Sequence, residues 1–375
     1  MRIAVNTRLL IKNKLEGIGR FTFEILKQLS TNNPNIEFHF IFDRKFSNEF
    51  IFSKNVTPHI LAPQTRHPLL WYIWLEIKLP RLINKINPDV FLSLDGFMST
   101  KIHTTTIIAI HDINFEHRPK DLKWAHSIFY RRYMKKYAQL ADHVITVSNF
   151  SKKDIVKRYK INSEKVSVVY NGVSSVFSPI SKEHQIKIRN QYSKGQEFFV
   201  FIGSLHKRKN IKNLLLAFDL FRNKNKTTTT NLLIIGEKKW WDRHTENTYQ
   251  TISYKNNVLF LGKMKDEDMA LILASTKALC FTSIFEGFGL PIVEAMAAGV
   301  PVITSNTSSM PEIAQDSALI VNPFKIKEIQ AAMSKIDTDE MLRSELIKKG
   351  QQRVKHFDWE KSSKKVLHII NNHHK

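Results

Sequence analysis

Two glutamates flank a glycine-rich turn in the segment FEGFGLPIVEAMAAGVPVITS, residues 285–305. Glu286 lies before the turn and Glu294 lies after it. Two carboxylates can act as general acid and general base, can hold a ligand, or can complement the dipole of a helix. The strands and helices around each glutamate decide between these interpretations.

Short runs rich in β-branched and aromatic residues alternate with helical stretches along the chain. Six such runs in the first half are RIAVNT, IEFHFIF, DVFLSL, TIIAIHD, HVITVS and VSVVY. Six more in the second half are FFVFIGS, NLLIIGE, VLFLG, ALCFTS, PVITSN and ALIVNP. Several are almost wholly apolar, as expected of parallel strands that are covered on both faces. The pattern predicts an α/β protein with doubly wound parallel sheets.

The alternation is interrupted once, by a polar and turn-rich segment that ends before Phe198. This interruption places a domain boundary near residues 176–196 and predicts two Rossmann-like domains that face each other across a cleft. The N-terminal domain is expected to cover residues 1–180 and the C-terminal domain residues 181–356. The tail, residues 357–375, contains FDWEKSSKKVLHIINN and has the pattern of a final amphipathic helix.

Ligands of doubly wound sheets bind at the carboxyl ends of strands, beside helix N-termini. After ALCFTS a helix is predicted to begin near Leu290 and Pro291, because proline suits the first helical turn. Glu294 lies one turn into this helix, where a carboxylate can bind ribose hydroxyls or simply complement the dipole. The backbone N–H groups at the start of the helix form an anion site suited to a diphosphate, and they belong to Phe288, Gly289 and Leu290.

Two other strand ends carry candidate groups. Lys207, Arg208 and Lys209 follow FFVFIGS and could neutralise a phosphate, although a run of cations is also typical of a solvated surface. His111 and Asp112 end TIIAIHD, where a histidine could contact a bound sugar, polarise a reacting centre, or serve a structural role.

Two short motifs give weaker signals. Gly17 and Gly19 precede a helix and nearly match a dinucleotide-binding fingerprint, but Thr22 occupies the third glycine position. Asp266 and Asp268 form a D-x-D sequence, which we interpret as the acidic first turn of a helix rather than as a metal site. The sequence shows no His, Cys or Glu cluster with metal-ligand spacing.

Composition limits the kind of partner and the compartment. The chain has 57 Lys and Arg against 34 Asp and Glu, a formal net charge of +23. This charge favours nucleic acid, an acidic membrane surface or phosphorylated ligands, although it can also reflect a generally basic proteome. The single cysteine, Cys280, cannot form an internal disulfide. With no cleavable signal and no apolar run of about 18 residues, we expect a cytoplasmic protein.

Together and in this order, these segments resemble the retaining GT-B glycosyltransferases of glycosyltransferase family 4, also called group 1. The most specific part is EGFGLPIVEAMAAGVPVITS, which is similar to the E-x7-E signature of the family. GIGRFTFEIL, HDINF, ADHVITVSNFSKKDI, VVYNGV and GSLHKRKNIKNLLLAF also match in order and spacing. The tail resembles the terminal helix that packs back onto the N-terminal domain in GT-B folds.

The resemblance implies a role for each matching residue. Glu286 corresponds to the glutamate that holds hydroxyls of the donor sugar, and Glu294 to the one that binds ribose. Lys209 corresponds to the phosphate-binding lysine, and His111 to the histidine beside the transferred sugar. Gly17 corresponds to the glycine that lets the N-terminal loop approach the donor phosphate and the acceptor.

The chain departs from the family pattern at one donor-binding position. Many members have Gly-Arg where this chain has Gly203 and Ser204. Either Arg208 supplies the missing cation, or Lys209 and the helix N-terminus suffice. Met264 lies at the position where the protein backbone of family members contacts the base of the donor nucleotide. The backbone groups that bind the diphosphate in family members correspond to those of Phe288, Gly289 and Leu290.

The resemblance implies transfer of a sugar from a nucleotide diphosphate sugar to a saccharide or lipid-linked acceptor, with retention and with no metal or other cofactor. GIGR, HDINF and GS followed by RKN are most similar to mannosyltransferases of surface polysaccharide assembly, which suggests GDP-mannose. The alternatives are a sugar-nucleotide epimerase or phosphorylase on the same fold, an NAD(P) oxidoreductase, which the incomplete fingerprint disfavours, and a basic nucleic-acid-binding protein. No recognised nucleic-acid module supports the last of these, and we expect no nucleic-acid partner.

Basic and aromatic residues gather in two parts of the N-terminal half, residues 66–86 and 130–140. Trp71, Tyr72 and Trp74 in the first part could rest on an anionic membrane, which would make the protein peripheral at the inner face. Alternatively, these aromatic side chains face the core and the basic ones are solvated.

Overall fold

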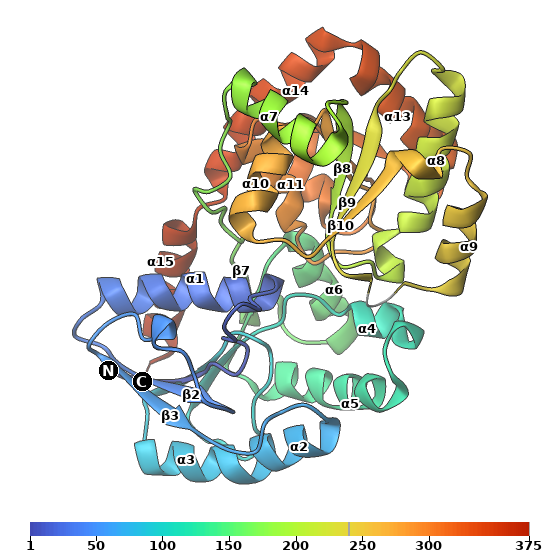
Figure 1. The fold of residues 1–375 in the computed structure, drawn as a ribbon. Helices are drawn as coiled ribbons and strands as arrows, with labels where there is room; N and C mark the ends of the chain where they lie inside the picture. Colours follow the sequence, from blue (N-terminus) through green and yellow to red (C-terminus); the bar gives the residue numbers. More distant parts are fainter. Residues whose placement is uncertain (239–240, 375) are drawn as a thin grey trace. The chain divides into compact units, whose positions relative to one another are not determined.

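The structure is a computed structural model that describes residues 1–238 and 241–374, and it divides into two compact units. The N-terminal unit comprises residues 1–172 together with the chain from Asp358 onward, and the C-terminal unit comprises Val173–Phe357. The division falls eight residues before the boundary expected after residue 180. Figure 1 shows that each unit combines one sheet with flanking helices.

The N-terminal unit contains a seven-stranded, wholly parallel sheet in the order β3-β2-β1-β4-β5-β6-β7. Its strands are β1 (Arg2–Asn6), β2 (Glu37–Phe42), β3 (Val56–Ile60), β4 (Val90–Ser93), β5 (Thr105–Ala109), β6 (His143–Thr146) and β7 (Val166–Val168). Its α-helices are α1 (Gly17–Asn32), α2 (Pro68–Ile73), α3 (Leu79–Ile86), α4 (Asn114–His117), α5 (Trp124–Leu140), α6 (Asn149–Tyr159) and α15 (Trp359–His373).

The C-terminal unit contains a six-stranded parallel sheet in the order β10-β9-β8-β11-β12-β13. Its strands are β8 (Phe198–Ile202), β9 (Asn231–Ile235), β10 (Val258–Gly262), β11 (Ala278–Phe281), β12 (Val302–Ser305) and β13 (Leu319–Val321). Its α-helices are α7 (Lys182–Ser193), α8 (Ile211–Lys224), α9 (Arg243–Thr251), α10 (Asp266–Ala274), α11 (Leu290–Ala297), α12 (Met310–Ala314), α13 (Ile326–Thr338) and α14 (Glu340–Arg353).

All twelve predicted runs contain a strand, and the predicted doubly wound α/β architecture is confirmed. Strand β3 was missed because its sequence, VTPHI, contains Pro58 and is only partly buried. A proline cannot donate to a sheet ladder, so it is tolerated in a strand that pairs on one side only, and β3 is such an edge strand. Helix α10 begins at Asp266 with three acids in its first turn, which confirms that the D-x-D sequence starts a helix.

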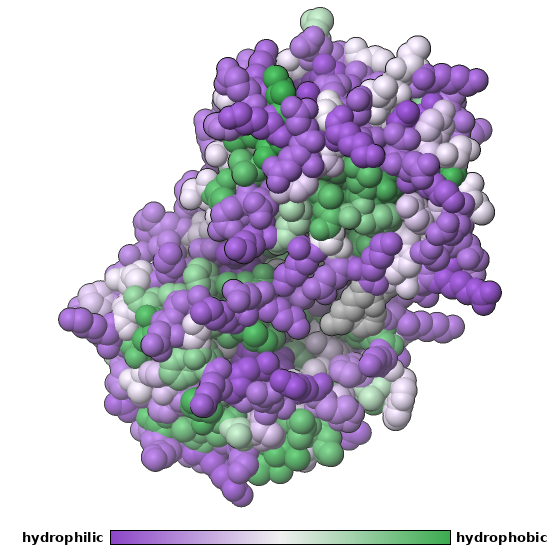
Figure 2. All heavy atoms as spheres, in the orientation of Figure 1, coloured by the Kyte–Doolittle hydropathy of each residue, from purple (hydrophilic) through white to green (hydrophobic). Residues whose placement is uncertain are grey.

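The core of the N-terminal unit corrects one sequence hypothesis. Trp71 and Trp74 are 7% and 0% exposed, and their indole N–H groups donate to the carbonyls of Thr65 and Leu61 at 2.6 and 2.7 Å. Neither tryptophan can therefore rest on a membrane, whereas Tyr72 remains 40% exposed. Hydrophilic side chains cover most of the face that Figure 2 shows. Among the described residues, no helix combines the length and apolar character needed to cross a bilayer.

Helix α15 completes the N-terminal unit by packing beside α1. The ring of Trp359 meets the ring of Phe21 at a centroid distance of 6.0 Å. The hydroxyl of Ser362 donates to the carbonyl of Tyr170 at 2.6 Å. The backbone of Gly172 lies so close to α15 that a Cβ atom there would overlap the backbone nitrogen of Trp359 and lie 2.5 Å from its Cγ.

We therefore expect Gly172→Ala to destabilise the docking of α15 by about 1–3 kcal/mol, because the added methyl group must displace backbone atoms. Urea denaturation followed by tryptophan fluorescence measures this change. Gly17→Ala is the control, because a Cβ at Gly17 would meet no atom within 4 Å. Equal stability of the two variants would contradict the prediction.

Candidate functional site

The candidate site of the C-terminal unit lies where β8 and β11 end side by side. The two strands are neighbours at the point where the strand order reverses, which is where doubly wound sheets bind ligands. The N–H of Ile284 donates to the carbonyl of Arg208 at 2.7 Å, and the side-chain amide of Asn210 donates to the carbonyl of Thr282 at 3.1 Å. These bonds join the loop after β8 to the loop after β11.

Glu286 lies between two cations from the loop after β8. Its Oε2 is 2.7 Å from Nη1 of Arg208, and its Oε1 is 2.7 Å from Nζ of Lys209. Glu286 and Lys209 are each only 7% exposed, and Arg208 also donates to the carbonyl of Phe285 at 2.9 Å. The three predicted site residues therefore form one charge cluster with a net charge of +1, in which Glu286 and Lys209 are buried and Arg208 is partly exposed.

The cluster fixes the charge of the carboxylate. Burial alone would raise the pKa of Glu286, but the charges and hydrogen bonds of Arg208 and Lys209 outweigh it and lower the pKa to about 2. Glu286 is therefore ionised at neutral pH. An ionised carboxylate accepts hydrogen bonds but has no proton to give, so Glu286 cannot serve as a general acid there.

The loop between Glu286 and α11 is held by two serines. The N–H of Glu286 donates to the hydroxyl of Ser308 at 3.0 Å, and the hydroxyl of Ser309 donates to the carbonyls of Glu286 and Phe288 at 2.9 and 3.0 Å. Gly289 precedes the helix with φ +103°, a conformation that favours glycine. Helix α11 begins at Leu290, as predicted, and the positive end of its dipole favours a bound anion there.

The remaining donor-site predictions lie at other places in the C-terminal unit. Glu294 is partly buried in the second turn of α11. Ser204 is exposed two residues after β8, and Arg208 is the second cation beside Lys209. Met264 follows β10, the edge strand two places from β8. The contacts of Glu294, Ser204 and Met264 with a donor stay predictions.

In the N-terminal unit, His111 follows β5 and its Nε2 is 2.9 Å from the carbonyl of Leu94, to which it can donate. Its ring lies nearly perpendicular to the ring of Phe21 at a centroid distance of 4.9 Å. Burial lowers the pKa of His111 despite the opposing effects of this hydrogen bond, Asp112 and Asp95. A neutral ring that donates from Nε2 presents Nδ1 as an acceptor. Gly17 is the first residue of α1, and its role beside a ligand stays a prediction.

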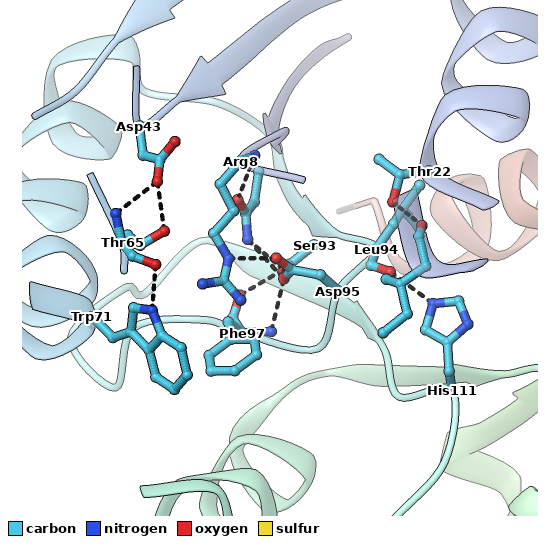
Figure 3. Close-up of polar contacts among 12 residues, drawn as sticks. Arg8, Thr22, Asp43, Thr65, Trp71, Ser93, Leu94, Asp95, Phe97 and His111 are labelled. Atoms are coloured by element: carbon cyan, nitrogen blue, oxygen red, sulfur yellow. Dashed lines mark hydrogen bonds and ion pairs between the residues drawn. The ribbon is translucent and has the colours of Figure 1, made fainter. Parts of the chain in front are cut away.

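Figure 3 shows a polar network that the sequence analysis missed. The Nε of Arg8 lies 2.5 Å from Oδ2 of Asp95, and both side chains are almost fully buried. Asp95 also accepts from the side chains of Asn6 and Ser93 and from the N–H of Phe97, at 2.8, 3.0 and 3.1 Å. The guanidinium carbon of Arg8 lies 4.0 Å from the centre of the Phe97 ring.

This network lies where β1 and β4 end, the point at which the strand order of the N-terminal sheet reverses. Leu94, whose carbonyl faces His111, is the residue directly before Asp95. Arg8 and Asp95 each follow closely after an apolar strand, and this position was the signal that the sequence offered. Among residues 1–238 and 241–374, no group of three His, Cys, Asp or Glu side chains is placed to hold a metal ion.

The depressed pKa of Glu286 predicts a pH-dependent stability. The unfolded chain binds the proton near pH 4.5 and the folded one only near pH 2, so the charged form stabilises the fold above pH 4.5 and this contribution is lost as the pH falls through 2. We expect Glu286→Gln to lose about 3 kcal/mol of this stabilisation near neutral pH. The difference in the free energy of unfolding between this variant and the unmodified protein should narrow by about 2 kcal/mol near pH 3.

Urea denaturation at several pH values measures this gap. Glu183→Gln, which changes an exposed glutamate of α7, serves as the control for a charge change alone. A gap for Glu286→Gln that stays constant from neutral to acidic pH would show that the carboxylate is not stabilised by its cations.

The buried pair of Arg8 and Asp95 yields a separate expectation. Asp95→Ala leaves the guanidinium charge buried without its partner, which costs about 3–5 kcal/mol. The double variant Arg8→Met with Asp95→Ala removes that charge as well, so it should lose less stability than the sum of the single variants. Urea denaturation of all three variants gives the coupling energy, and strict additivity would argue against the pair.

Comparisons with known proteins agree with this architecture and site. Residues 15–176 match the family model described as Glycosyltransferase Family 4, and residues 183–353 match the one described as Glycosyl transferases group 1. The chain is 26% identical to O-antigen chain mannosyltransferase B of Escherichia coli over 95% of its own length and 96% of that protein. It is 27% identical to O-antigen chain mannosyltransferase RfbU of Salmonella typhimurium over 76% of its length and 75% of that protein.

Among solved structures, Anabaena Alr3699/HepE in complex with UDP and glucose aligns with a TM-score of 0.77 and 16% identity, covering 99% of each chain. This likeness concerns the fold, which is GT-B. The two family matches together span most of the chain. The protein therefore belongs to the group 1 glycosyltransferases of glycosyltransferase family 4.

Proposed function

We propose that this glycosyltransferase moves mannose from GDP-mannose to a saccharide or lipid-linked acceptor during assembly of a surface polysaccharide. The names of the two O-antigen mannosyltransferases support the choice of sugar and pathway class. The observation that carries the proposal is the charge cluster of Glu286, Arg208 and Lys209 at the β8–β11 switch point. Its excess positive charge suits a nucleoside diphosphate, and its carboxylate suits sugar hydroxyls.

In this proposal each residue has a distinct task in cleaving the sugar–phosphate bond. Arg208, Lys209 and the N-terminus of α11 stabilise the negative charge that grows on the departing diphosphate. Glu286 accepts hydrogen bonds from the sugar and Glu294 from the ribose. The acceptor hydroxyl attacks from the face that the diphosphate leaves, and a phosphate oxygen takes its proton, so the configuration is retained and no metal is required.

The ionised state of Glu286 supports this division of tasks, because a carboxylate whose pKa is lowered to about 2 cannot protonate a leaving group near neutral pH. An epimerase or phosphorylase on the same fold is not favoured by the comparisons. We place the protein in the cytoplasm, peripheral to the anionic inner face of the membrane, where a lipid-linked acceptor would be reached.

Donor recognition can be measured by calorimetry with GDP-mannose, UDP-sugars and dTDP-rhamnose. We expect GDP-mannose to bind at least about 10-fold more tightly than the other nucleotide-sugars. The variant Lys209→Gln should bind GDP-mannose about 10–100-fold more weakly than the unmodified protein, because one charge-assisted phosphate contact is lost. Preference for another nucleotide would overturn the donor assignment. Affinity unchanged by Lys209→Gln would overturn the placement of the diphosphate.

For catalysis, we expect Glu286→Gln to lower kcat for release of GDP in the presence of acceptor membranes by a factor of about 100 or more. Glu197→Gln is a matched control, because Glu197 also pairs with cations, Lys277 and Arg189, but lies at the amino end of β8. Near-full activity of Glu286→Gln, or inversion of the anomeric configuration in the product by NMR, would contradict the proposed mechanism.

A further inference from the structure

The buried network of Arg8 and Asp95 lies beside His111 and takes no part in the reaction as proposed. Asp95 is 7% exposed and Arg8 is 6% exposed. Figure 3 shows Leu94 between Asp95 and His111. Leu94 links the two groups, because it directly precedes Asp95 and its carbonyl lies 2.9 Å from Nε2 of His111. What fixes this carbonyl therefore also fixes the histidine ring.

The turn of residues 93–97 is held from within by Asp95. Its Oδ1 accepts from the side chain of Asn6 at 2.8 Å and from the N–H of Phe97 at 3.1 Å. Its Oδ2 lies 2.5 Å from Nε of Arg8. Asn6 is the last residue of β1 and Arg8 follows that strand closely. One carboxylate therefore closes the turn after β4 and ties it to the end of β1.

The same turn also rests against β5, the strand that leads to His111. Gly96 has φ +81°, and a Cβ atom on it would lie 3.1 Å from the carbonyl oxygen of Ala109 and 3.5 Å from Cγ1 of Ile110. The turn approaches β5 this closely because glycine has no side chain and tolerates a positive φ. Asp95 and Gly96 therefore set the position of the turn relative to the end of β5.

The ring of His111 is bound at one nitrogen only. A carbonyl can only accept a hydrogen bond, so Nε2 carries the proton in the bond to Leu94. Burial lowers the pKa of His111, so the ring is neutral near neutral pH and Nδ1 is an acceptor. In the described part of the chain, Nδ1 has no hydrogen-bond partner, while the ring face packs beside Phe21. A hydroxyl from outside the protein can therefore donate to Nδ1.

We propose that Asp95, together with Arg8, is a positioning residue for His111. By fixing the carbonyl of Leu94, the pair holds the imidazole so that Nδ1 accepts a hydrogen bond from a hydroxyl of the transferred sugar. The presence of that sugar rests on the proposed function, whereas the hold on the ring exists without substrate. A side chain whose orientation is fixed in advance loses little freedom when the sugar binds.

The first test is NMR of the full chain with isotope-labelled histidine and no substrate. The hydrogen-bonded Hε2 of His111 should exchange slowly and give a resonance, which His111→Gln assigns by removing it. We expect Asp95→Asn to abolish this resonance, because an amide has one acceptor oxygen and turns its NH2 toward either Arg8 or Phe97. Asp43→Asn is the matched control and should keep the resonance, since Asp43 is also buried and also accepts from an arginine and a backbone N–H.

The second test is steady-state kinetics with the nucleotide-sugar that the calorimetric panel selects. We expect Asp95→Asn to lower kcat about 10–100-fold, because the sugar loses an oriented partner. KM for the donor should change by less than about 2-fold, because the diphosphate contacts remain. Asp43→Asn should keep kcat within about 2-fold of the unmodified protein. A merely structural role of Asp95 would lower stability and leave kcat per folded enzyme unchanged.

Gly96→Ala moves the turn without altering the carboxylate, and it replaces Asp95→Asn if that variant does not fold. Its Cβ must push against the end of β5, so the same losses of the His111 resonance and of kcat are expected. Gly195→Ala is its control. Gly195 lies between α7 and β8 with φ +78°, and a Cβ there would also meet an atom at 3.1 Å, the side-chain oxygen of an asparagine.

Three results would overturn the inference. They are a His111 resonance that survives in both Asp95→Asn and Gly96→Ala, an equal loss of kcat in the two controls, and full kcat in a variant that has lost the resonance. If no nucleotide-sugar binds to the unmodified protein, the proposed function fails. The NMR comparison alone then decides whether Asp95 positions His111.

Discussion

The site of the C-terminal unit depends on the carboxylate of Glu286 being buried between Arg208 and Lys209. Burial makes a lone charge costly, and each member of the cluster offsets that cost for the others. The same contacts join the loop after β8 to the loop after β11, so the electrostatic cluster also fixes the backbone from which α11 starts. The charge of the cluster, the positions of the two loops and the start of α11 therefore depend on one another.

The N-terminal unit repeats this arrangement with different residues. In each sheet the strand order reverses between two neighbouring strands, β1 and β4 in one unit and β8 and β11 in the other. In each, a buried cation after the first strand pairs with a buried carboxylate after the second, as Arg8 does with Asp95. Parallel strands bring their carboxyl ends to one edge, so residues 87 positions apart can meet there.

The sequence was sufficient for the architecture because apolar runs of strand length report burial on both faces of a parallel sheet. It also located Glu286, Arg208 and Lys209 by their positions after strands, but not the ion pairs among them, since pairing depends on side-chain directions across two loops. Arg8 and Asp95 were missed because single charged residues form no motif. Trp71 and Trp124 have similar basic and aromatic surroundings in sequence, and only tertiary packing buries one and exposes the other.

The charge of the cluster constrains how a donor could be bound. The carboxylate of Glu286 already pairs with Arg208 and Lys209, each at 2.7 Å. A diphosphate would compete for the same N–H donors. Because the cluster carries one positive charge in excess, a diphosphate would be attracted to it even while the carboxylate stays ionised. As the cations turn toward phosphate, the oxygens of Glu286 would lose donors and gain capacity for sugar hydroxyls. In the proposed function, binding of the diphosphate and of the sugar would therefore be coupled through this one carboxylate.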